Sequence, residues 1–125
     1  MLFRSRLVVE TAQIQNNRIA EILKTHPDRF YGFATVPLQA PHLAAAELER
    51  AVRLGLHGVE ICTNVAGKNL DEPELDEFWS KAQELGTAIL LHPHNVAAMD
   101  RLGAYYLNNL IGNRLDTTIA IASLI

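Results

Sequence analysis

The chain has 125 residues, 49% of them hydrophobic, and a formal net charge of −3, which predicts one globular domain or part of one. This slightly acidic balance excludes the basic surface that nucleic-acid-binding domains usually carry, and the longest apolar run, residues 119–125, is too short to cross a bilayer. We therefore expect a soluble protein. Because the single cysteine, Cys62, cannot form an internal disulfide, we expect it in the reducing cytoplasm.

Helical and extended patterns alternate in the first half of the chain. Apolar residues at helical spacing predict a helix over residues 14–24, which the following His-Pro-Asp sequence ends. A strand is predicted over residues 30–36 and stops at Pro37. Pro41 then opens a second helix at a favoured first-turn position, and Gly55 closes it.

The second half continues the alternation. Its predicted elements are, in order, a strand over residues 58–62, a helix over residues 71–85, a strand over residues 88–91, a helix over residues 98–110 and a last helix from about Asp116. We expect Asp71 to cap its helix and Cys62 to be buried in its strand. Strands about 30 residues apart match βα units. We therefore expect three adjacent parallel strands with helices packed on one side.

Polar side chains follow the ends of these strands. The third strand reads as a buried run and ends in His92 and His94, while Asn64 and Thr63 follow the second strand and Thr35 ends the first. Ligands bind at the carboxyl ends of parallel strands in α/β proteins, so the two imidazoles are candidates for metal ligation or proton transfer. The alternative is a pair of surface-loop histidines, and threonine and asparagine at such positions are ordinary turn residues.

Other chemistries lack their motifs. The chain has no glycine-rich phosphate loop, no dinucleotide fingerprint and no G-x-S-x-G elbow. The remaining histidines, His26, His42 and His57, are interpreted as surface residues. The acids between residues 71 and 77 stand in the first turns of a predicted helix, where they complement its dipole, and we interpret them as a solvated face.

Several motifs in fixed order resemble one known family. They are the sequences of residues 26–30 (His-Pro-Asp-Arg-Phe), 32–38 (Gly-Phe-Ala-Thr-Val-Pro-Leu), 58–61 with Thr63-Asn64, 90–93 (Leu-Leu-His-Pro) and 116–121 (Asp-Thr-Thr-Ile-Ala-Ile). The chain resembles, over almost its whole length, the amidohydrolase-related family of aminocarboxymuconate-semialdehyde decarboxylase and γ-resorcylate decarboxylase.

The resemblance implies a TIM barrel with a divalent metal, usually zinc, at the carboxyl ends of its strands. It implies that His92, at the end of the fifth barrel strand, is a metal ligand. His94 stands where such decarboxylases often have tryptophan after His-Pro, a departure from the family pattern, and we expect it either to contact the substrate or to support a residue that does. Asn64 is a further candidate substrate contact. The expected substrate is a small carboxylated molecule, which the metal would help to decarboxylate or hydrolyse.

Several motifs of the family pattern do not occur in this sequence. The His-x-His motif of the first barrel strand and the histidine and aspartate of later strands are absent from these residues, and a whole TIM barrel needs about 250 residues. We expect residues 1–125 to be a fragment of a single amidohydrolase-type domain, roughly its third to fifth βα units, and to be inactive alone.

An alternative reading is a non-catalytic α/β module. Three parallel strands cannot close a barrel, and their outer strands offer unpaired backbone groups. Self-association or pairing with another chain would satisfy these groups. We therefore expect a homo-oligomer.

Overall fold

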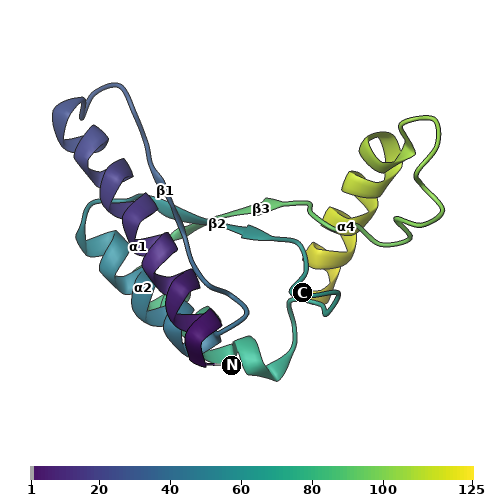
Figure 1. Cartoon of the computed structure of the whole chain (residues 1–125), viewed down its shortest axis with the longest axis horizontal. Coiled ribbons are helices and arrows are strands. Elements are labelled where there is room, and N and C mark those ends of the chain that lie inside the picture. The colour runs from purple at the N-terminus through teal and green to yellow at the C-terminus, as the bar shows by residue number, and fades with distance from the viewer. Residues whose placement is uncertain (1) are drawn as a thin grey trace. The chain divides into compact units, whose positions relative to one another are not determined.

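The structure is a computed structural model that describes the backbone of residues 2–125 and the side chains of residues 6–125. Helices and strands alternate along the chain (Figure 1). In order they are α1 (Leu2–Thr25), β1 (Phe33–Thr35), α2 (Pro41–Arg53), β2 (Gly58–Cys62), the 3-10 helix η1 (Pro73–Leu75), α3 (Asp76–Leu85), β3 (Ala88–His92), the π-helix η2 (Asn108–Gly112) and α4 (Asn113–Ser123). The chain forms two compact units. The first comprises the residues up to 61 and residues 74–90, and the second comprises residues 62–73 and 91–125.

The three strands form one open parallel sheet in the order β1-β2-β3, which confirms the predicted order. β1 and β2 pair in the register that places Phe33 opposite Gly58 and Thr35 opposite Glu60. The sheet is tightest at Gly58, where an added Cβ would lie 2.6 Å from the carbonyl oxygen of Ala88 and 2.6 Å from the ring of Phe33. Glycine at this position therefore lets both neighbouring strands approach β2.

Two helices of the first unit have termini that the sequence predicted. α2 begins at Pro41, and its Leu48 and Ala51 are fully buried. α3 ends where Gly86, with a φ of 58°, forms a left-handed C-cap. α1 contacts α2, α2 contacts α3, and both α1 and α2 contact β1. The apolar faces of these helices are thus buried against one another and against the sheet.

The first helix is longer and the first strand shorter than predicted. α1 begins at Leu2 rather than residue 14, and neither it nor any other helix in the described part of the chain is long and apolar enough to cross a membrane. β1 covers only Phe33–Thr35 of the predicted residues 30–36. The side chains of Phe30 and Tyr31 are 50% and 82% exposed, so the apolar character of these residues does not reflect membership of the sheet.

The third strand is not the buried strand that its apolar run predicted. Its five residues alternate between exposed and half-buried, with Leu90 46% exposed. β3 lies at the edge of the sheet, so one side lacks a neighbouring strand among the described residues. Cys62, predicted to be buried, is also exposed. It is the last residue of β2 and shares a face of the strand with the exposed Glu60.

Two predicted helices differ in the second half. α3 begins at Asp76 after the 3-10 helix η1, its N-cap is Leu75, and no side chain caps it, so Asp71 is not the cap. The prediction of a helix over residues 98–110 is wrong. Tyr105 and Tyr106 adopt φ angles of 56° and 61°, which a right-handed helix cannot contain. Only the short η2 forms there, and it leads directly into α4, three residues before the predicted start.

A buried polar cluster joins α1, α2 and β1 within the first unit. Asn16 is fully buried, and its Nδ2 donates to the carbonyl oxygen of Thr35 at 2.9 Å and to Oε1 of Glu47 at 2.7 Å. Its Oδ1 accepts the Thr35 backbone N–H at 2.9 Å. Arg50 donates to both carboxylate oxygens of Glu47 at 2.7 and 2.8 Å. The cluster thus bonds both backbone groups of the residue that ends β1.

The environment of Glu47 favours its ionised form. Burial by itself raises the pKa of the carboxyl, but hydrogen bonds from Arg50 and Asn16 and the positive charge of Arg50 lower it by more. The net pKa is below the ordinary value of 4.5. The same pairing raises the pKa of Arg50. Glu47 therefore contributes stability as a carboxylate.

We expect Glu47→Gln to lower the free energy of unfolding by about 2 kcal/mol at pH 7, because it removes a buried charge-assisted pair. Since the folded-state pKa is lowered, the stabilisation by Glu47 is present above the unfolded pKa and is lost as the pH falls through the folded-state value. The variant should therefore lose less stability than the wild type below about pH 4.5. Urea unfolding at neutral and acidic pH measures both effects.

Glu21→Gln is the matched control, because Glu21 forms an ion pair with Arg18 at a side-chain exposure of 61%. Such an exposed pair contributes about 0–1 kcal/mol. Equal losses in the two variants would contradict the stabilising role of the buried pair.

Candidate functional site

The ends of β2 and β3 bring three of the predicted site residues together in the second unit. His92 is the last residue of β3, and its carbonyl oxygen accepts the Thr63 backbone N–H at 3.3 Å. The carbonyl oxygen of His94 accepts a hydrogen bond from Nδ2 of Asn64 at 2.9 Å. The side chains of both histidines are exposed. Two imidazoles thus extend from the carboxyl end of a parallel strand, while their backbone is bonded to the residues that follow the neighbouring strand.

The side chain of Asn64 is engaged by the surrounding backbone. Its Nδ2 also lies 3.3 Å from the carbonyl oxygen of Asn95 and 3.1 Å from Oδ2 of Asp116. Its Oδ1 accepts the Gly67 backbone N–H at 3.0 Å. The amide therefore joins its own turn to the loop that follows β3.

A buried carboxylate, Asp116, lies at the centre of this arrangement. It is 5% exposed and belongs to the first turn of α4. Its Oδ1 accepts the Ala97 backbone N–H at 2.9 Å, and its Oδ2 accepts hydrogen bonds from the Thr63 hydroxyl and from Asn64. Thr63, itself only 2% exposed, donates at both its backbone nitrogen and its hydroxyl. This cluster was not predicted, because an acid in the first turn of a helix is usually a solvated partner of the helix dipole.

The described residues do not form a complete metal centre by themselves. No group of three or more His, Cys, Asp or Glu side chains within residues 2–125 is arranged to hold a metal ion. Structural and catalytic zinc sites use three or four protein ligands. His92 could therefore supply one ligand of such a site, but the described side chains do not supply the set.

The other predicted surface residues lie where the sequence placed them. His26, His42 and His57 are exposed. Nδ1 of His42 is 2.7 Å from Oε1 of Glu77, an exposed pair between α2 and α3. The His57 ring accepts the Gly32 backbone N–H at 3.2 Å. These contacts give the three histidines structural surroundings and no shared site.

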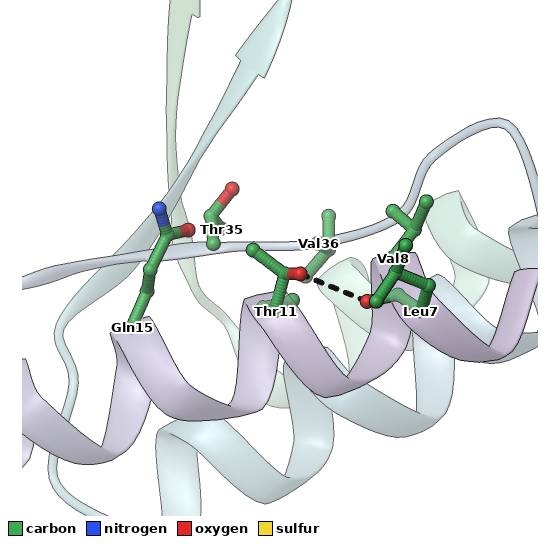
Figure 2. Close-up of a pocket in the computed structure, with 7 residues that line it drawn as sticks. Leu7, Val8, Thr11, Gln15, Thr35 and Val36 are labelled. Atoms are coloured by element: carbon green, nitrogen blue, oxygen red, sulfur yellow. Dashed lines mark hydrogen bonds between the residues drawn. The ribbon is translucent and has the colours of Figure 1, made fainter. Parts of the chain in front are cut away.

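A groove of about 320 Å³ in the first unit lies between α1 and the residues that end β1 (Figure 2). Gln15 and Thr35 stand at one end of it, and Leu7 and Val8 at the other. The hydroxyl of Thr11 donates to the carbonyl oxygen of Leu7 at 2.8 Å. No titratable side chain lines the groove. It therefore offers apolar and neutral polar side chains and no group for acid–base chemistry.

Known proteins match the chain over most of its length. A 2-amino-3-carboxymuconate-6-semialdehyde decarboxylase from Dictyostelium discoideum is 37% identical over 118 residues, which cover 94% of the chain and 33% of that protein. A γ-resorcylate decarboxylase from Polaromonas sp. is 37% identical over 99 residues, covering 73% of the chain and 30% of the relative. The chain thus spans about a third of the length of these relatives.

A solved structure agrees with the sequence matches. The crystal structure of a dihydroxybenzoic acid decarboxylase from Polaromonas sp., with bound manganese and the inhibitor 2-nitroresorcinol, superposes with a TM-score of 0.83 at 33% identity. The match covers 96% of the chain and 40% of that structure. The family model described as Amidohydrolase matches residues 2–118. The chain therefore belongs to the amidohydrolase family, and its relatives include decarboxylases of this family.

Proposed function

We propose that the chain is a segment of a metal-dependent decarboxylase that removes CO2 from a small carboxylated aromatic substrate. The observation that carries the proposal is the position of His92, an exposed imidazole at the carboxyl end of a parallel strand in a chain of this family. Relatives named as decarboxylases favour decarboxylation over hydrolysis. The manganese in the solved relative supports a divalent metal without indicating zinc.

In this proposal the chain is one part of a TIM-barrel domain, roughly its third to fifth βα units. The three parallel strands and the share of the relatives that the chain covers both support this assignment. His92 would supply one metal ligand, and the remaining ligands would come from barrel strands outside residues 1–125. A bound divalent metal would polarise a substrate oxygen. The described residues alone support no step through it.

His94 and Asn64 are the proposed substrate contacts. The exposed His94 side chain stands two residues beyond the strand end, where an imidazole can donate to a carboxylate or a phenolic oxygen. Nδ2 of Asn64 could donate to a substrate only by giving up one of its present hydrogen bonds. We therefore propose His94 as the direct contact and a weaker contribution from Asn64.

The chain alone should bind a divalent metal only weakly. We expect the purified 125-residue protein to hold manganese or zinc weakly, because a single imidazole leaves most of the coordination sphere to water. Elemental analysis after dialysis should find much less than one metal ion per chain. A content close to one ion per chain would show that His92 and His94 build a site without further strands.

A chimera tests the function itself. We would place the chain in the aligned position of the Polaromonas γ-resorcylate decarboxylase, whose other strands would supply the rest of the barrel. The chimera should release CO2 from γ-resorcylate in the presence of manganese, and His92→Ala should abolish both the activity and the bound manganese.

His26→Ala is the control for this experiment, because His26 is an exposed histidine of the first unit. It should leave both measurements unchanged. An active chimera that keeps its metal and its activity after His92→Ala would disprove the proposed ligand.

The second candidate function, association through the sheet edge, is favoured by the exposure of β3. Because β3 is an edge strand with Leu90 46% exposed, a second copy could add a strand to it. We expect Leu90→Lys to reduce self-association in sedimentation equilibrium. Ile14→Lys on α1, where Ile14 is 69% exposed, is the control. Equal association of both variants and the wild type would exclude the β3 edge as the interface.

A further inference from the structure

We propose that Asp116 is a positioning residue, which holds the backbone that carries His92 and His94. The proposal rests on the function proposed above, since that function gives the two histidines a ligand. The hydrogen bonds that carry it are independent of any ligand. Asp116 acts on the two histidines through Thr63 and Asn64.

Asp116 accepts hydrogen bonds from three donors. Its two oxygens accept hydrogen bonds from the Thr63 hydroxyl, from Nδ2 of Asn64 at 3.1 Å and from the Ala97 backbone N–H at 2.9 Å. These donors come from the turn after β2 and the loop after β3, two segments that α4 does not adjoin in sequence. Hydrogen bonds to an ionised carboxylate are about twice as strong as neutral ones. Asp116 therefore ties both segments to α4.

The second step is that both intermediaries also bond the backbone of a histidine. Thr63 donates its backbone N–H to the carbonyl oxygen of His92 at 3.3 Å, and Asn64 donates Nδ2 to that of His94 at 2.9 Å. One carboxylate thus fixes the side chains of the two residues that hold the two histidine backbones. The imidazole rings are exposed. These backbone contacts therefore fix the backbone positions from which the two histidine side chains extend.

The third step is apolar support on the far side of the loop. Val96 is only 7% exposed. Gly112 packs closely against it, since a Cβ added to Gly112 would lie 2.7 Å from Cγ2 of Val96. The loop also contains Asn95 and Ala98 with φ angles of 50° and 57°, conformations that persist where surrounding contacts over-determine them. Ala97, whose backbone N–H donates to Asp116, lies between these two residues. The segment after His94 is thus held by packing and by hydrogen bonding together.

A simple role for Asp116 at the helix terminus does not account for these contacts. An acid in the first turn complements the helix dipole whether or not other segments bond it. Such a role requires neither burial nor three donors from elsewhere. The two roles differ in their consequence: loss of a dipole partner lowers stability, whereas loss of the positioning residue also loosens the two histidines in a protein that is still folded.

The test measures backbone motion in the full 125-residue chain by NMR without metal. In Asp116→Ala we expect the 15N order parameters of His92 and His94 to fall from about 0.85 to below about 0.6, and the Ala97 amide to exchange at least tenfold faster. Asp100→Ala removes an exposed acid from the same loop and should change neither measurement. Unchanged order parameters in folded Asp116→Ala would overturn the proposal.

A second pair of variants keeps the test decisive if Asp116→Ala fails to fold. Thr63→Val keeps the shape of the side chain and removes its hydroxyl, while Thr63→Ser keeps the hydroxyl and removes a methyl group. Positioning through the hydrogen bond predicts loose histidines in Thr63→Val and ordered ones in Thr63→Ser. The reverse result would assign Thr63 to packing and overturn the proposal.

Added Mn²⁺ separates this proposal from the proposed function. In the wild type, the paramagnetic ion should broaden the imidazole signals of His92 before those of His26. No selective broadening would contradict the metal-ligand role, while the order parameters of the metal-free variants would still decide the positioning role. The two proposals can therefore fail independently.

Discussion

The cost of burying a carboxylate governs the polar architecture of both units. An ionised carboxylate away from water is tolerated only when hydrogen bonds or an opposite charge replace its hydration. Glu47 in the first unit and Asp116 in the second are 3% and 5% exposed, and each collects donors from more than one segment. Each segment that donates is held in place by the need to satisfy the charge. The two acids therefore hold in place the strand ends, which the hydrogen bonds between the strands of a short sheet do not fix.

The two carboxylates meet this requirement in different ways. Glu47 is paired with Arg50, and the pair lies along a single helix, α2, with Asn16 as a bridge to β1. Asp116 accepts hydrogen bonds from a hydroxyl, an amide and a backbone N–H, all of them neutral donors. An arginine partner for Asp116 would have placed a long side chain in the loop beside the histidines. Neutral donors from the loop itself satisfy the acid and order the loop in the same set of contacts.

Sequence patterns predicted best where one local signal determined an element. β2 has its predicted bounds, Gly58–Cys62, and α2 begins at Pro41, because strand periodicity and proline geometry act within a few residues. The helix predicted over residues 98–110 failed because apolar spacing does not reveal left-handed backbone at Tyr105 and Tyr106. The exposure of β3 was missed for a related reason: a continuous apolar run does not distinguish a central strand from an edge strand.

The candidate site divides in the same way. His92, His94 and Asn64 could be proposed because they directly follow strands, and position along the chain is enough to gather them at one end of a parallel sheet. Asp116 could not, because its role depends on contacts with Thr63 and Asn64, more than 50 residues earlier. The motif beginning at Asp116 contributed to the family resemblance without revealing its contacts. The residue that organises the loop was therefore less visible in the sequence than the residues that the loop presents.

The open edge of the sheet and the proposed metal site are linked by geometry. β3 ends at His92, and a strand that pairs with β3 in parallel would lie about 5 Å away, with its own carboxyl end beside that of β3. Residues following such a strand would therefore stand next to the His92 imidazole. The contacts that complete the sheet would also bring further ligands to the site. Because Asp116 and its donors already fix the backbone on the β3 side, a neighbouring strand would meet an ordered loop, and ligand binding would not have to pay the full entropy of ordering it.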